Sequence, residues 1–202
     1  MTTSVWRDSV VAYIRNEAQP VDKFGHQPRL YALCCQIAEG ESCDDDVLFA
    51  AAWMHDLGVF TGHRPADPEE LARWDHVPYT IARSAELLRG WGFPPEKLDS
   101  VAEAIRTHQP KDNPAFIEAV VLRDADILEQ LGAIGTLRAM VKIGRDSRYR
   151  TYSDVMPVLV RAISELPDKL QLPQSRKLAL ARIDLSRGFL DAIGEEAGES
   201  LY

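Results

Sequence analysis

Apolar residues recur along this chain at the three-to-four-residue spacing of amphipathic helices, and this pattern limits the fold more than any other feature of the sequence. Alternating runs bounded by hairpin turn residues, which would predict β-strands, are almost absent. The pattern is clearest after Asp44, where four residues take the i, i+3, i+4 and i+7 positions of one helix face: Leu48, Ala51, Ala52 and His55. The sequence therefore predicts an all-α protein.

Caps and helix breakers divide the pattern into separate elements. Helices are expected at about residues 4–17, 25–40, 47–58, 75–91, 96–108, 114–132, 153–166 and 174–194, with a further helix after Gly135. Residues 59–74 contain two prolines and two charged clusters, which predict a rim or lid loop with a short helical turn. No internal repeat or linker interrupts the chain. We therefore expect one domain over residues 1–202.

Composition narrows the function classes. With 46% hydrophobic and 27% charged residues, the chain is typical of a folded soluble protein. A net charge of -8 argues against binding a nucleic-acid polymer, which usually requires a surplus of basic residues. No apolar run reaches the roughly 18 residues of a membrane span, and no secretion signal is visible, so a cytoplasmic protein is expected. Three cysteines without metal-ligand spacing are expected to be reduced thiols packed as small hydrophobes: Cys34, Cys35 and Cys43.

Histidines and acids on these helices carry the chemistry. The candidates are His26, the adjacent His55 and Asp56, His76, His108, and one acid of the pair Asp124 and Asp126. Imidazole and carboxylate groups together suit a divalent ion of Mn, Fe, Co, Ni, Zn or Mg. Adjacent residues project about 100° apart on a helix, so a neighbouring His and Asp reach one ion only at a helix end. A buried aspartate there needs a cation, with a salt bridge to an arginine as the alternative.

The choice between Asp124 and Asp126 stays open on spacing alone. Residues two apart project about 200° from each other, so only one of the two faces the site.

The ordered set of histidines and acids resembles the HD-domain metal-dependent phosphohydrolase superfamily. Its central signature is similar to the segment AAAWMHDLG, and its later Asp-bearing helix is similar to RDADILEQLGAIG. The resemblance covers about residues 22–138 and implies an HD helical bundle, with residues 139–202 as accessory helices. It also implies an inner metal site made by His26, His55, Asp56 and Asp126, because the Ala-Asp-x-Leu pattern selects Asp126. Asp124 would then support the site or pair with a nearby basic residue, with a charge on the helix surface as the alternative.

The resemblance further implies a metal-dependent hydrolase that cleaves a phosphorylated small molecule, with a nucleotide favoured, through a water activated by one or two ions. Asp56, His76 and His108 are the implied catalytic residues, and the two histidines bind either a second metal or substrate phosphate. Arg64 in the rim loop is expected to join them in binding substrate, ahead of three weaker cationic candidates: Lys23, Arg138 and Lys142.

Some HD nucleotidases place a glutamate shortly after the HD pair, and this chain has none there, since it continues as Leu57-Gly58-Val59-Phe60-Thr61. Three loop acids are weaker substitutes for it, and a solvated surface is their favoured reading: Asp67, Glu69 and Glu70.

Two other functions use the same residues. HD-type oxygenases hold two irons with a comparable set of six ligands, so a di-iron oxygenase is one alternative. A non-catalytic sensor of a nucleotide or metal is the other. The C-terminal helices are expected chiefly to pack within the molecule, with a homodimer interface as their alternative use.

Overall fold

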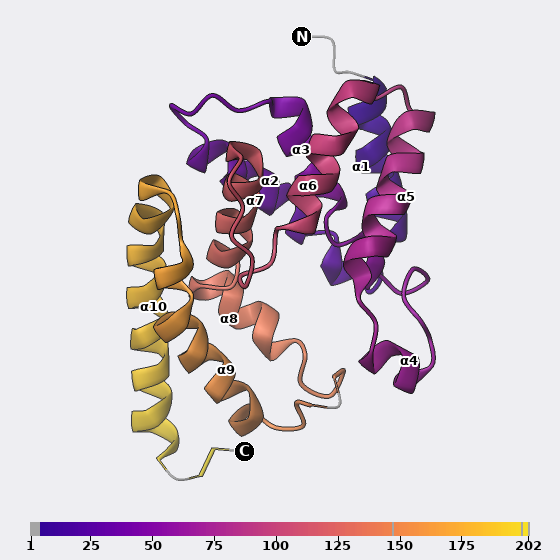
Figure 1. Cartoon of the computed structure of the whole chain (residues 1–202). Coiled ribbons are helices and arrows are strands. Elements are labelled where there is room, and N and C mark those ends of the chain that lie inside the picture. Colours follow the sequence, from indigo (N-terminus) through magenta and orange to yellow (C-terminus); the bar gives the residue numbers. More distant parts are fainter. Residues whose placement is uncertain (1–4, 147, 199, 202) are drawn as a thin grey trace. The chain divides into compact units, whose positions relative to one another are not determined.

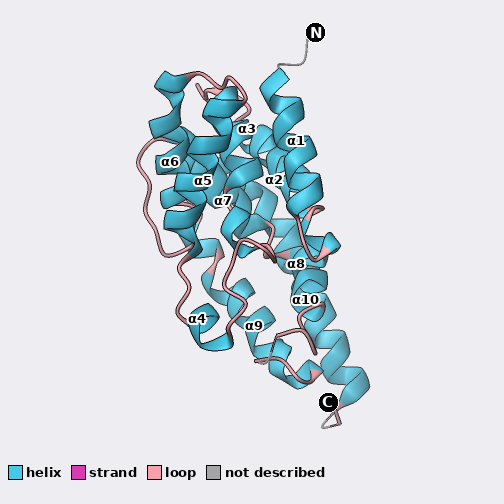
Figure 2. Ribbon diagram, turned by 90° about the vertical axis from the view of Figure 1, so that its right-hand side faces the viewer, coloured by secondary structure: helices cyan, strands magenta, loops and turns pink. Residues whose placement is uncertain are grey.

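A computed structural model describes residues 5–146, 148–198 and 200–201 of the chain. In these residues every regular element is a helix, as Figure 2 shows. The one extended pairing among them is an isolated bridge between Thr61 and Arg64. The all-α prediction is therefore confirmed. The chain divides into two compact units, Met1–Arg123 and Asp124–Tyr202, and the boundary lies inside one helix. Whether these two units make up the single domain expected over residues 1–202 stays a prediction.

The first unit contains all the candidate ligands except the acids Asp124 and Asp126. Its helices are α1 (Val5–Glu17), α2 (His26–Ile37), α3 (Asp45–Met54), α4 (Pro68–Ala72), α5 (His76–Gly90), α6 (Leu98–Arg106) and the beginning of α7 (Ile117–Leu128). Three short 3-10 helices join them: η1 (Val21–Lys23), η2 (Leu57–Val59) and η3 (Pro95–Lys97). The predicted loop at 59–74 does contain one short helix, α4, whose first turn is capped by the Asp67 carboxylate.

Helix α3 is the centre of this unit. Its first turn is capped by Asp44, whose carboxylate accepts hydrogen bonds from the backbone N–H groups of Asp46 and Val47. The sequence predicted one buried stripe, but every residue from Val47 to Met54 is buried. The reason is that α3 is surrounded by neighbours, since α1, α2 and α6 all pack against it. A helix enclosed in this way holds the residues at its end in fixed positions.

Helix α3 ends at Met54, earlier than the Gly58 that the sequence predicted. Gly58 lies in η2, and its N–H donates to the Thr80 hydroxyl at 3.0 Å instead of continuing the helical hydrogen bonds. His55 and Asp56 therefore follow directly on the last helical residue. This is the helix-end position that the spacing argument requires of an adjacent His-Asp pair.

The second unit is formed by the rest of α7 together with α8 (Gly132–Met140), α9 (Tyr152–Glu165), η4 (Pro167–Lys169) and α10 (Pro173–Ala197), coloured from salmon to yellow in Figure 1. Helices α8, α9 and α10 pack pairwise around a small core of Ala139, Val155 and Leu159. Helix α8 begins before Gly135, contrary to the prediction. Gly135 lies so close to the chain before it that an added Cβ would stand 2.3 Å from the carbonyl of Gln130.

Asp124 is fully buried in this unit and has a structural role. Its carboxylate accepts hydrogen bonds from the backbone N–H of Gln171 at 3.0 and 3.1 Å and from that of Leu172 at 2.9 Å. Leu172 is the residue before α10, so Asp124 fixes the start of that helix. The reading of Asp124 as a surface charge is therefore wrong.

Two further expectations concern surface and burial. Among the described residues, none of the helices is apolar over a stretch long enough for a membrane span. None of the three cysteines is in a disulfide, and Cys34 is buried. Cys35 is exposed, so packing as a small hydrophobe is wrong for that residue.

Candidate metal centre

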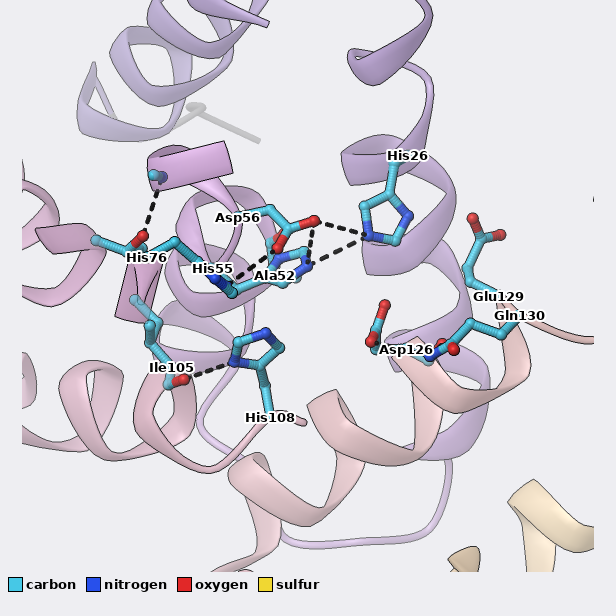
Figure 3. A network of polar contacts seen from close by, with 12 residues as sticks. His26, Ala52, His55, Asp56, His76, Ile105, His108, Asp126, Glu129 and Gln130 are labelled. Atoms are coloured by element: carbon cyan, nitrogen blue, oxygen red, sulfur yellow. Dashed lines mark hydrogen bonds and ion pairs between the residues drawn. The ribbon is translucent and has the colours of Figure 1, made fainter. Parts of the chain in front are cut away.

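Five side chains of metal-ligand type converge in the first unit from four separate segments (Figure 3). His26 is the first residue of α2 and His76 is the first residue of α5, while the other three stand at or just beyond helix ends: His55, Asp56 and His108. The histidines His26, His55 and His108 are 4%, 0% and 3% exposed, whereas the Asp56 side chain retains 21% exposure. The cluster is thus almost enclosed, with its carboxylate reachable from solvent.

Asp56 lies between two groups of imidazoles. Its Oδ2 is 3.6 Å from Nε2 of His55 and 3.9 Å from Nε2 of His26, and its Oδ1 is 3.6 Å from Nε2 of His76. The two groups His26–His55–Asp56 and Asp56–His76–His108 each have ligand atoms within 4.8 Å of one another. The ring of His108 also faces those of His55 and His76, with centroids 5.1 and 5.7 Å apart. One carboxylate therefore serves both groups.

Backbone carbonyls fix the orientation of two of the imidazoles. Nδ1 of His55 lies 3.0 Å from the carbonyl oxygen of Ala52, and Nδ1 of His108 lies 2.6 Å from that of Ile105. Because a carbonyl oxygen only accepts, each Nδ1 must carry the proton, and in the neutral ring Nε2 keeps its lone pair. Both rings thus turn a potential metal-binding nitrogen toward the cluster, as metal-ligating histidines do.

Sequence reasoning missed these two carbonyls, although a signal for them existed. The last carbonyl groups of a helix have no helical partner, and a histidine just beyond the end can donate to one of them. His55 follows α3 directly and His108 lies two residues beyond α6, so both stand where this bond forms.

Electrostatics keep Asp56 ionised. Burial raises the pKa of this carboxyl, but the neighbouring imidazoles, His55 first and then His26, His108 and His76, together hold it well below its usual range. Among the described residues its ion-pair partners are histidines, and no arginine is among them. The alternative of a salt bridge between Asp56 and an arginine is therefore wrong.

The donor atoms fit a divalent metal. Nε2 of His55 bears a lone pair and lies 3.3 Å from Nε2 of His26, next to a charged carboxylate oxygen. A positive charge among these three atoms satisfies all of them at once, and mixed nitrogen and oxygen donors suit the first-row divalent ions. The cluster is capable of holding such an ion.

The remaining predicted ligand, Asp126, belongs to the second unit. It is partly exposed, and its Oδ2 lies 3.4 Å from Nε2 of Gln130. Its place in the ligand set stays a prediction.

Other polar candidates lie outside the cluster. Arg64 is exposed on the rim loop, and its role in substrate binding stays a prediction. His63 is hydrogen-bonded to the Tyr79 hydroxyl at 2.8 Å and to the Glu17 carboxylate at 3.0 Å, so it connects the rim loop to α1 and α5.

The loop acids and the weaker cationic candidates also lie outside the cluster. Asp67 caps α4, and Glu69 and Glu70 beside it are exposed, as expected of a solvated surface. Of the weaker cationic candidates, Arg138 is 3.4 Å from the Glu129 carboxylate, Lys142 is exposed and Lys23 is half-buried.

Residues 24–131 match the model of the HD domain family. No curated protein matches the chain. Among solved structures, that of Bacillus subtilis YpgQ in complex with ADP is similar, with 21% identity, 96% of each chain covered and a TM-score of 0.74. A predicted HD superfamily hydrolase from an uncultured Thermotogales bacterium has 22% identity, covers 95% of this chain and 92% of its own, and gives a TM-score of 0.65. An HD-superfamily hydrolase from Bacillus thuringiensis has 17% identity over 94% and 95% of the chains, with a TM-score of 0.70.

Proposed function

Because the chain belongs to the HD domain family, we propose that it is a metal-dependent phosphohydrolase that acts on a phosphorylated small molecule, with a nucleotide as the favoured class. One observation carries this proposal: two groups able to hold a metal ion share the Asp56 carboxylate at the end of α3. The HD-superfamily hydrolases among the similar structures support hydrolysis, and the ADP complex of YpgQ supports a nucleotide.

In this proposal His26, His55 and Asp56 hold the first ion, with Asp126 as a further ligand. Bound in this position, a divalent ion would supply a water of lowered pKa and would polarise the phosphoryl oxygen of the substrate. Asp56 stays ionised and accepts hydrogen bonds, so it is suited to orient the attacking water rather than to take up its proton.

His108 and His76 have two proposed uses. With its Nδ1 proton on the Ile105 carbonyl, neutral His108 offers a lone pair on Nε2 to a second ion. In its cationic form both ring nitrogens donate, so Nε2 then presents a proton to a phosphate oxygen. His76 stands beside it, at the opposite oxygen of Asp56, and is proposed to act in the same way. Arg64 is proposed to bind the phosphate from the rim loop, since a guanidinium can donate two parallel hydrogen bonds to it.

The test is a screen of nucleotides and phosphorylated metabolites against protein loaded separately with Mn, Fe, Co, Ni, Zn or Mg, with phosphate or pyrophosphate release as the readout. We expect turnover of at least one nucleotide, and a loss of about 100-fold or more in His55→Ala and Asp56→Ala. His63→Gln is the matched control, because His63 lies outside the cluster, and it should retain turnover.

Two results would contradict the proposal. Oxygen consumption by protein containing two irons would identify the di-iron oxygenase instead. Nucleotide binding without turnover under every metal tested would identify a sensor.

A further inference from the structure

The turn that follows Asp56 contacts the segment that carries His76 through the N–H, the carbonyl and the Cα of Gly58. The N–H of Gly58 donates to the hydroxyl of Thr80 at 3.0 Å, and its carbonyl accepts from the indole N–H of Trp74 at 2.9 Å. Its Cα faces α5 so closely that an added Cβ would stand 2.9 Å from the carbonyl oxygen of His76. All the polar backbone groups of Gly58, and the face of its Cα, are therefore engaged by residues 74–80.

The Thr80 hydroxyl supplies the Gly58 N–H with an acceptor that the local backbone does not provide. The first N–H groups of a helix have no helical partner, and Gly58 is buried in η2, away from water. Thr80 is fully buried as well, and it supplies the acceptor for that N–H. A buried N–H without an acceptor is costly, so the hydroxyl holds the turn against α5.

Gly58 and Thr80, which this hydrogen bond joins, both lie next to the candidate metal centre in the chain. Asp56 precedes Gly58 by two residues, and His76 precedes Thr80 by four, which places Thr80 one turn further along the same face of α5. The two segments joined by the hydrogen bond thus carry Asp56 and His76, whose Oδ1 and Nε2 atoms are 3.6 Å apart. A shift of the turn along α5 would change that separation directly.

We infer that Thr80 and Trp74 are positioning residues that set the spacing between the Asp56 carboxylate and the His76 imidazole, and through it the affinity of the centre for a divalent ion. The inference rests on the proposed function, because it assumes that these two side chains bind metal. Neither residue needs to touch the ion. Thr80 acts through the Gly58 N–H, and Trp74 acts through the Gly58 carbonyl.

The test is calorimetric titration of the full chain with Mn²⁺. Thr80→Val keeps the shape of the side chain but removes the acceptor, and it should weaken Mn²⁺ binding by about 10–100-fold, the range found when groups that orient metal ligands are removed. Thr80→Ser keeps the hydroxyl and should bind Mn²⁺ within about three-fold of the wild type. Trp74→Phe keeps an aromatic ring without the N–H, and it should weaken binding in the same direction as Thr80→Val.

Ser84→Ala is the matched control, because Ser84 lies one turn beyond Thr80 on α5, is buried, and has no hydrogen bond to Gly58 among the described contacts. It should leave Mn²⁺ affinity unchanged. In a His76→Ala background, Thr80→Val should add less than about three-fold, because a residue that sets the spacing between Asp56 and His76 loses this effect once the imidazole is gone. A general loss of stability would instead weaken binding equally in both backgrounds.

The inference is overturned if folded Thr80→Val or Trp74→Phe binds Mn²⁺ like the wild type while His76→Ala binds it more weakly. It is also overturned if Thr80→Ser loses as much affinity as Thr80→Val. If Thr80→Val does not fold, Trp74→Phe and Thr80→Ser still decide between these results. A wild-type chain that binds none of the six metals of the screen would instead refute the proposed function itself.

Discussion

Replacing Gly58 with alanine tests how closely η2 and α5 approach each other. The new Cβ would lie 2.9 Å from the His76 carbonyl oxygen, 2.9 Å from Oγ1 of Thr80 and 3.0 Å from Cβ of His76. Two of these atoms belong to the backbone or the first side-chain carbon of α5, so they cannot turn aside. Overpacking of this kind typically costs about 1–3 kcal/mol of folding free energy.

A smaller effect acts in the opposite direction. Alanine restricts the unfolded chain more than glycine does, which stabilises the folded state by about 0.4–1 kcal/mol where the backbone conformation permits it. The steric cost exceeds this gain, and we expect Gly58→Ala to lower the free energy of unfolding by roughly 1–2 kcal/mol. In a chain of this length the melting temperature should fall by about 2–4 °C for each kcal/mol.

Gly90→Ala is the control for this prediction. Gly90 is the last residue of α5 and is exposed, and an added Cβ there meets nothing within 4 Å. The steric cost is absent, so this variant should be as stable as the wild type or gain up to about 1 kcal/mol. Urea unfolding of the three proteins, followed by circular dichroism, measures both changes. A Gly58→Ala variant as stable as Gly90→Ala would refute the close packing of Gly58 against α5.

Three further changes should also be measurable by unfolding. Asp124→Ala leaves the backbone N–H groups of two partly buried residues before α10 without their charged acceptor and should cost about 2–4 kcal/mol, so an unchanged melting temperature would exclude the anchoring role. Ser84→Ala removes a buried hydroxyl that has no partner among the described residues, and it should be neutral or stabilising by about 1 kcal/mol; a clear loss of stability would count against this reading. Burial raises the pKa of Asp44 and of Asp46, but the Lys97 ammonium lowers both, and the lowering dominates. The two carboxylates therefore stabilise the folded state above their unfolded pKa of about 4, and this stabilisation is lost as the pH falls through their folded pKa values. Lys97→Met should therefore make stability less dependent on pH below about 4, and an unaltered pH profile would contradict the ion pairs.

The sequence predicted the helices well because their apolar positions follow a regular period. Helices α2, α5 and α9 begin within one residue of their predicted starts, since caps and breakers mark them. The ends of α3 and α6 were predicted too late. They depend on tertiary contacts, such as the bond between Gly58 and Thr80, which no local pattern encodes.

The candidate site could be predicted as a set of residue types but not as an arrangement. The order of histidines and acids indicated which side chains to consider, and five of them converge in the first unit. The role of Asp124 could not be derived, because it depends on backbone groups of Gln171 and Leu172, far along the chain. The carbonyls that orient His55 and His108 were missed because the ends of α3 and α6 were predicted too late, so neither histidine was placed beyond a helix end.

The measurement that tests the central claim most directly is the metal content of the purified chain after loading and removal of excess metal. Wild type and His63→Gln should retain at least one equivalent of divalent metal per chain, while His55→Ala, which removes the ring that lies 5.1 Å from those of both His26 and His108, should retain almost none. Equal metal content in wild type and His55→Ala would contradict the account.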